Sequence, residues 1–318
     1  EISSKKNMSS ITEQSNPITS QIDQCNAQQI LNLLQQVDMQ MFATNDEYNM
    51  IHSSKVIQSI MKRGCGRIET LIKLVDESYR DNTTVKASVA FSGAGTSGRL
   101  SYFCANTYNE SLSRVLRLKH GRRESYNRIE LFKYLVAGGY RALVAAQESA
   151  EDDPVMAVQD FTQAIKDEKH VVYVGITCGM SAPYVAGQLH HMIQHYSNYP
   201  ESTSILLGFN PVEAARKLAI EKWPKTDEPK TFYSIAKDME QAEGSMPDQF
   251  IILNPILGPE AVTGSTRMKG GSGTKLILDV MFATSLIHAL SAVAYHEDEI
   301  IFRLLSGFQE TIHYTYQF

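Results

Sequence analysis

The stretch Ser88-Val-Ala-Phe-Ser-Gly-Ala-Gly-Thr-Ser-Gly-Arg99 decides the fold class of this chain. A short apolar run that passes directly into a glycine-rich turn predicts a buried strand, and the turn leads into a helix. Four more short apolar runs predict strands of the same kind, at residues 134–137, 171–176, 205–209 and 250–253. Segments with helical spacing, such as residues 156–165 and 184–193, lie between most of them.

This alternation predicts a three-layer α/β fold. Helical crossovers between neighbouring strands make the sheet mostly parallel, and the helices then cover both of its faces. We expect a parallel sheet of about five strands flanked by helices. Ahead of it, apolar residues recur at helical spacing from Ile30 to Met41 and from Val56 to Val75, which predicts an N-terminal helical segment.

Composition and charge exclude several classes of function. The 318 residues are 43% hydrophobic and 20% charged, which suffices for a large buried core. The net charge of -5 provides no positive field to hold a nucleic acid, so no nucleic acid is expected as a partner. The apolar runs are short or interrupted, for example by Asp279 and Thr284, so no membrane partner is expected either.

Cysteine and histidine spacing predicts no metal site. The four cysteines stand far apart, which favours a reduced, intracellular setting over a zinc or redox motif. His191 and His195 form an i,i+4 pair on an expected helix, an arrangement that can hold a metal. No glutamate stands beside them in the metalloprotease order, so a surface or interface role is favoured.

Residues 93–98 match the pattern G-x-G-x-x-G directly after a strand, which is typical of a dinucleotide site. Such a site also needs an acidic residue at the end of the second strand, and the second run here ends in Ala137-Gly-Gly139 instead. No Gly-Lys-Ser/Thr follows the glycines, so a phosphate-loop NTPase is disfavoured as well. We expect no cofactor.

A site for one phosphate monoester fits the glycine-rich turn better. Its glycines let backbone N–H groups approach an anion, and Thr96 and Ser97 add hydroxyls beside the start of a helix. Residues 177–181 and 263–266 follow other strands and bring more hydroxyls to the same edge of the sheet. The alternative is a structural turn with an ordinary serine cap.

An acidic cluster precedes the expected helix at residues 156–165. Most of it is interpreted as negative charge at a helix N-terminus, with Pro154 at an early helical position. One carboxylate could instead accept hydrogen bonds from sugar hydroxyls, and the spacing does not identify which one. The cluster consists of Glu148, Glu151, Asp152 and Asp153.

Three stretches, taken together, resemble one family. They are Ser92-Gly-Ala-Gly-Thr-Ser-Gly-Arg99, Glu148-Ser-Ala-Glu-Asp-Asp153 and Gly258-Pro-Glu-Ala-Val-Thr-Gly-Ser-Thr-Arg-Met-Lys-Gly-Gly-Ser-Gly-Thr-Lys275. The family is the branch of sugar isomerase (SIS) domain proteins that contains N-acetylmuramic acid 6-phosphate etherase and the glucokinase regulatory protein. Residues 11–17, 179–187, 208–211 and 314–316 are also similar to the regulatory protein, so the resemblance covers nearly the whole chain.

The resemblance implies a non-catalytic regulator that binds fructose phosphates and inhibits glucokinase. Fructose 6-phosphate would favour the inhibited complex and fructose 1-phosphate would weaken it, in the cytoplasm and the nucleus. The etherases carry a glutamate where this chain has Thr107, and a threonine cannot act as a tuned carboxyl near neutral pH. The alternative is an etherase-like lyase or a sugar-phosphate isomerase.

The resemblance also assigns site residues. For Arg267 the residues themselves favour bracing of its loop against a carboxylate such as Glu260 over contact with phosphate, because backbone N–H groups and hydroxyls already supply donors and a long glycine-rich loop must be held in one conformation. The set expected to bind the fructose phosphate is Thr96 and Ser97 on the phosphate, Glu151 on a sugar hydroxyl, and Thr177, Cys178 and Gly179 in the near wall. Further candidates in the surrounding loops are Gly95, Gly98, Glu148, Ser181, Ser265, Thr266 and Arg267.

We expect four regions along the chain. They are a polar tail at residues 1–20, the N-terminal helical segment at 21–80, the SIS domain at 81–296 and a helical connector at 297–318. Because the family has tandem SIS domains and a helical cap, we expect this chain to be a piece that stops before a second SIS domain.

Overall fold

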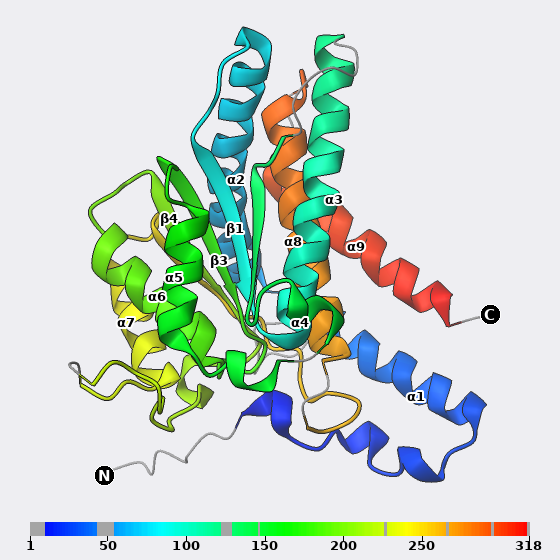
Figure 1. Cartoon of the computed structure of the whole chain (residues 1–318). Coiled ribbons are helices and arrows are strands. Elements are labelled where there is room, and N and C mark those ends of the chain that lie inside the picture. Colours follow the sequence, from blue (N-terminus) through cyan, green and yellow to red (C-terminus); the bar gives the residue numbers. More distant parts are fainter. Residues whose placement is uncertain are drawn as a thin grey trace, which may run out of the picture.

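The computed structural model describes residues 10–42, 54–121, 129–145, 147–225, 228–264, 267–293 and 296–316. One parallel sheet has the strand order β2-β1-β3-β4-β5 (Figure 1). Each strand overlaps the apolar run that predicts it, and the predicted three-layer α/β fold is confirmed. The strands are β1 (Ala87–Gly93), β2 (Phe132–Val136), β3 (His170–Ile176), β4 (Ser202–Leu207) and β5 (Phe250–Leu253).

Helices cover both faces of the sheet because successive residues of a buried strand point to opposite sides. In β1, Val89 and Phe91 pack toward one helical layer and Ala90 packs toward the other. The first layer consists of α2 (Lys55–Asp81), α3 (Gly95–His120) and α8 (Lys269–Leu290), with α9 (Glu297–Thr315) packed on α8 (Figure 1). The second layer consists of α5 (Pro154–Ala164), α6 (Pro183–Tyr196) and α7 (Phe232–Ser245).

Among the described residues, α8 is the one helix that is long and apolar enough to cross a membrane. Its most apolar window is 56% buried inside the protein, and the helix packs against α2, α3 and α9. Asp279 and Thr284 interrupt its apolar run, yet the helix as a whole is long and apolar enough to meet this criterion. The apolar character of α8 is explained by its place in the core.

From residue 10 on, the N-terminal segment differs from the polar tail that is expected at residues 1–20. Residues 1–9 lie outside the described residues, but Thr12, Asn16 and Thr19 are each no more than 5% exposed. Hydrogen bonds rather than apolar burial hold these residues, which is why low hydrophobicity misled the prediction. The segment consists of three short 3₁₀ turns, η1 (Ile11–Glu13), η2 (Pro17–Thr19) and η3 (Ile22–Gln24), followed by α1 (Ala27–Met39).

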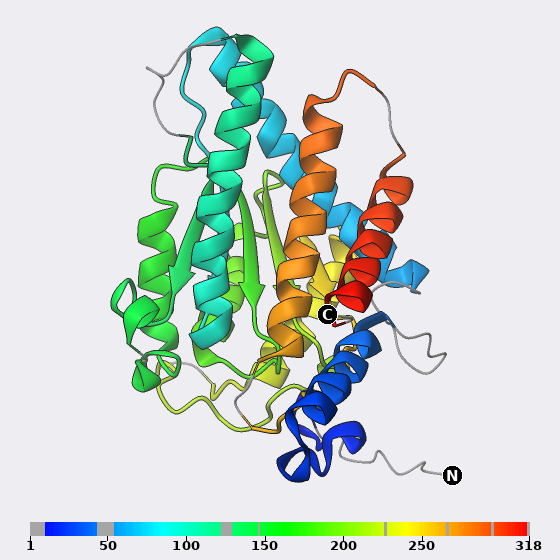
Figure 2. The ribbon, with the colours of Figure 1, turned by 90° about the vertical axis from the view of Figure 1, so that its right-hand side faces the viewer.

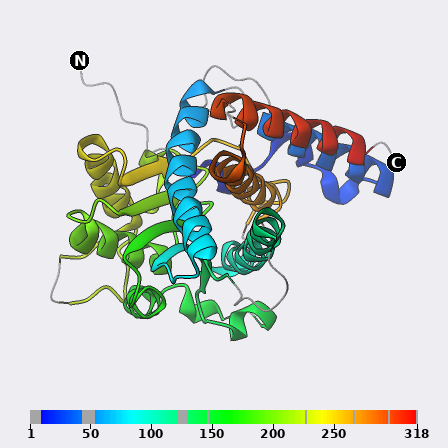
Figure 3. The same ribbon diagram turned by 90° about the horizontal axis from the view of Figure 1, so that it is seen from above.

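The helices α1 and α9 lie far apart in the sequence but pack side by side (Figures 2 and 3). Tyr316 donates a hydrogen bond from its hydroxyl to Asp38 Oδ2 at 2.6 Å. Gln35 Nε2 donates to the backbone oxygen of His313 at 3.2 Å. The last described helix is therefore packed on the first, at the side of the molecule on which α8 lies.

Candidate functional site

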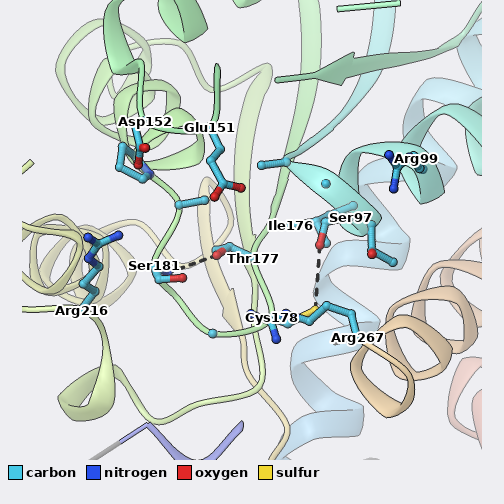
Figure 4. A pocket seen from close by; sticks show the side chains of 16 residues that line it. Ser97, Arg99, Glu151, Asp152, Ile176, Thr177, Cys178, Ser181, Arg216 and Arg267 are labelled. Carbon is cyan, nitrogen blue, oxygen red and sulfur yellow. Dashed lines mark hydrogen bonds between the residues drawn. The ribbon is translucent and has the colours of Figure 1, made fainter. Parts of the chain in front are cut away.

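A cavity of about 300 Å³ opens at the carboxyl edge of the sheet, where β1 and β3 end side by side (Figure 4). Gly93 is paired with Ile176 at that edge, so the loops after both strands reach the same place. The structure thus brings most of the predicted site residues together, and their binding roles stay a prediction. Those in the cavity wall are Gly95, Thr96, Ser97, Glu151, Thr177, Cys178, Gly179, Ser181 and Arg267.

The start of α3 forms one side of the cavity. Gly95 has a φ of 54°, which glycine adopts without strain and which turns the chain from β1 into the helix. No side chain caps the helix, and the first N–H groups of any helix have no intrahelical acceptor. Gly98 serves packing instead, since an added Cβ would come within 2.7 Å of Val136 Cγ1. Thr96 and Ser97 therefore place hydroxyls at the positive end of a 26-residue helix, where phosphate binds favourably.

The loop after β3 forms a second side. Thr177 Oγ1 accepts a hydrogen bond from the Ser181 N–H at 3.2 Å, which closes the loop on itself. The sulfur of Cys178 lies 3.9 Å from the hydroxyl oxygens of both Ser97 and Thr274. Burial raises the pKa of the Cys178 thiol, so this part of the wall is neutral near pH 7.

The acidic cluster divides between two roles. Asp153 caps α5, because its Oδ1 accepts hydrogen bonds at 3.1 and 2.9 Å from two N–H groups of the first turn, and Pro154 is the first helical residue. The prediction of a charged helix N-terminus is confirmed for this residue. Glu151 and Asp152 line the cavity, where carboxylates can accept hydrogen bonds from sugar hydroxyls. The side chain of Glu148 lies outside the described residues.

Arg267 lines the cavity from the segment that precedes α8. Its Nη2 donates to Glu13 Oε1 at 3.1 Å, and its Nη1 donates to the backbone oxygen of Gly264 at 3.2 Å. These bonds join the segment to the N-terminal turns. Ser265 and Thr266, which are also predicted site residues, lie outside the described residues.

Glu260 is not the carboxylate that braces Arg267 here, which corrects the expected pairing. Its side chain is buried, and its two oxygens accept hydrogen bonds from the N–H groups of Lys269 and Gly270 at 2.8 and 2.9 Å. Glu260 therefore caps α8 at its N-terminus. The Lys269 ammonium, buried beside it, donates to Gln40 Oε1 at 2.8 Å, and burial lowers the pKa of Lys269 to about 8.

Three polar residues of this region were missing from the predicted site. Arg99 and Arg216 line the cavity. Asn210 is fully buried behind it, where its amide donates to the Gly179 oxygen at 3.1 Å and accepts from the Ile11 N–H at 2.9 Å. Arg99 lies in the quoted glycine-rich stretch and the other two follow the fourth strand, so their positions in the sequence were an available signal.

Potential metal ligands lie elsewhere in the described part of the chain. One ligand atom each of Glu69, His288 and Glu297 falls within 4.8 Å of the others, between α2, α8 and α9. Both carboxylates already pair with lysines, Glu69 with Lys73 and Glu297 with Lys62. These residues are not part of the cavity wall, and we assign them no metal.

Thr107 lies on the exposed surface of α3, beyond the first turns that carry Thr96 and Ser97. It does not line the cavity. The residue type at position 107 therefore does not change the groups that face the cavity of a single chain.

A parallel five-stranded sheet whose polar cavity lies between the turn into α3 and the loop after β3 defines a SIS-domain protein. Within that class, residues 69–193 match the family described as "Glucokinase regulatory protein N-terminal SIS domain". The match identifies residues 69–193 as a SIS domain of this kind.

Relatives of two kinds are similar to the chain. It is 34% identical to the glucokinase regulatory protein of Xenopus laevis and 31% identical to that of Homo sapiens, over 85% of this chain in both cases. It is 30% identical to N-acetylmuramic acid 6-phosphate etherase of Vibrio campbellii over 68% of this chain and 54% of that enzyme. The chain spans 39% of the length of the regulatory proteins.

Proposed function

We propose that this chain is a sugar-phosphate-responsive regulator that binds fructose phosphates and inhibits glucokinase. In this proposal fructose 6-phosphate favours the inhibited complex and fructose 1-phosphate weakens it. The similarity to glucokinase regulatory proteins also leads us to propose that the protein acts in the cytoplasm and the nucleus. Imaging of a fluorescent fusion in the source cells would test this location.

The cavity is the observation that carries the proposal. Thr96 and Ser97 provide hydroxyls at a helix N-terminus, and Glu151 provides a carboxylate at another place in the same cavity wall. Figure 4 shows Glu151 apart from Ser97. The hydrogen-bond donors at the start of α3 suit a phosphate, and the carboxylate elsewhere in the wall suits hydroxyls. Together they suit a molecule with one phosphate and several hydroxyls. The similarity to glucokinase regulatory proteins supports a regulatory use of that binding.

A double variant, Thr96→Ala with Ser97→Ala, tests the binding site. Each lost charge-assisted hydrogen bond should cost about 1.5–3 kcal/mol of binding free energy. Titration calorimetry with fructose 6-phosphate and fructose 1-phosphate measures the loss, and Thr107→Ala is the matched control on the exposed surface of the same helix. Unchanged affinity in the double variant would remove these hydroxyls from the site.

A coupled assay of glucokinase tests the regulatory step. We expect the chain to lower glucokinase activity, more strongly with added fructose 6-phosphate and less strongly with fructose 1-phosphate. Inhibition of the same strength with and without either sugar phosphate would contradict the proposed response. Binding of a sugar phosphate without any effect on glucokinase activity would contradict the proposed partner.

An etherase activity is the second candidate, because an etherase relative matches two thirds of this chain and Glu151 faces the cavity. Incubation with N-acetylmuramic acid 6-phosphate and measurement of released lactate distinguishes the two. Release at enzyme-like rates, lost in Glu151→Gln, would replace the regulator by an enzyme.

A further inference from the structure

Two guanidinium groups of the cavity wall have no hydrogen bond or ion pair with any described residue. They belong to Arg99 and Arg216. The third arginine of the wall, Arg267, is paired with Glu13. Figure 4 places Ser97 and Arg99 on one side of the cavity and Arg216 on the other side, near Ser181.

Arg216 is held in place although it lies in a loop. Its N–H donates to the backbone oxygen of Met180 at 3.1 Å, and its own backbone oxygen accepts from the Tyr233 N–H at 3.0 Å. The two preceding alanines are buried. The position of the Arg216 backbone is therefore fixed relative to the loop after β3, while its side chain remains exposed at the cavity.

A ligand with one phosphate would use the cationic and donor groups on only one side of this cavity. Held at the start of α3, it would be neutralised by the helix terminus, by the hydroxyls of Thr96 and Ser97, and by Arg99 beside them. The carboxylates of Glu151 and Asp152 lie between the two sides and suit neutral hydroxyls. Arg216 would then face the far end of the ligand, where its planar fork matches a phosphate or a carboxylate.

We propose that the cavity selects phosphorylated sugars that carry a second anionic group at the opposite end, and that Arg216 is the residue that selects them. The proposal rests on the proposed function, since it assumes that the first phosphate lies at Thr96 and Ser97. It adds the substrate class, which is a sugar bisphosphate or a phosphorylated sugar acid.

Titration calorimetry on the full chain tests this with four ligands. Fructose 6-phosphate and fructose 1-phosphate carry one anionic group, fructose 1,6-bisphosphate carries a second phosphate, and 6-phosphogluconate carries a carboxylate. The two doubly anionic probes should bind about tenfold more tightly than the monophosphates, since each gains a charge-assisted contact. Their advantage should shrink as KCl is raised.

Arg216→Gln should abolish that advantage, so that the doubly anionic probes bind no more tightly than the monophosphates do. Lys217→Gln is the matched control, because it removes the same charge one residue further along without altering the cavity wall. Arg216→Lys, which keeps the charge but loses the fork, should retain part of the advantage. Circular dichroism verifies that each variant is folded.

The outcomes separate the two proposals. Monophosphate binding without a gain for either doubly anionic probe, or a gain that survives in Arg216→Gln, overturns the role of Arg216 and leaves the proposed function standing. A gain for only one of the two probes narrows the class to a phosphate or to a carboxylate and supports the proposal. Failure of every hexose phosphate to bind overturns both.

Discussion

The loop that leads from β1 into α3 and the segment that leads from β5 into α8 reach the same edge of the sheet, yet different bonds hold them. The first is fixed by its own backbone and by the next strand, through bonds from the Gly98 N–H to the Ala94 oxygen and from the Ala137 N–H to the Gly93 oxygen. The second depends on side chains from the far N-terminus. Asn16 Nδ2 donates to the Pro259 oxygen at 3.0 Å.

The conformation of the first loop is determined by a short motif, whereas the conformation of the second segment depends on residues far away in the chain. A glycine-rich turn carries its conformation locally, because glycine permits the required backbone angles and the close approach to the helix. A long segment gains a single conformation only when distant groups bind it, since its own residues leave many conformations open. The segment before α8 should therefore be the part of the cavity wall that substitutions disturb most.

Removing the cap of α8 should have the largest effect. Glu260→Ala leaves two buried N–H groups without an acceptor and removes the carboxylate beside the buried Lys269 ammonium. We expect a loss of about 3–5 kcal/mol in the free energy of unfolding, measured by urea denaturation. Glu260→Gln, which keeps one acceptor oxygen, is the control and should lose less. Equal stability of wild type and Glu260→Ala would show that the segment holds without its cap.

Replacement of the buried Lys269 should have an intermediate effect on the free energy of unfolding, and the size of that effect should depend on pH. Its pKa of about 8 in the folded protein lies below the value of about 10.4 for an unfolded lysine. Between these values the unfolded chain binds more protons, so stability rises with pH across this window.

Compared with Lys269→Met, the wild type should gain about 1–3 kcal/mol of unfolding free energy between about pH 8 and pH 10. Urea denaturation of both proteins at several pH values measures the gain, and the difference between them cancels the titration of other groups. A constant difference across this range would mean that the ammonium is better solvated than its burial indicates.

Arg267→Met should have the smallest effect on global stability. Its pair with Glu13 is partly exposed, so the loss should stay below about 1 kcal/mol. Local opening of the segment should increase, which limited proteolysis detects as faster cleavage before α8. Glu13→Gln should reproduce that cleavage if the ion pair is what matters. Unchanged cleavage together with a collapse of sugar-phosphate affinity would instead identify Arg267 as a direct phosphate ligand.

The parts of the fold that the sequence predicted are those with local signals. Apolar runs identified all five strands, and the glycine-rich turn identified Thr96 and Ser97. Their proximity to Thr177 followed from one rule, that parallel strands end at the same edge.

The missed parts depend on contacts between distant residues. Burial of Asn16 and the partner of Arg267 are set by bonds that span most of the chain, and no periodicity in the sequence reports them. Arg216 was overlooked for a different reason. It follows the fourth strand after an interval long enough that only the folded loop returns it to the cavity.

The bonds of the N-terminal turns also set an order of events during synthesis. The Ile11 N–H finds its acceptor on Asn210, 199 residues later, and Glu13 finds Arg267 after 254 residues. Ribosomes release a chain from its N-terminus at about 5–20 residues per second. At that rate, tens of seconds pass between the synthesis of these two residues and the synthesis of their partners. Ile11 and Glu13 therefore reach these native contacts long after they are made, and this side of the cavity cannot be completed before translation has passed Arg267.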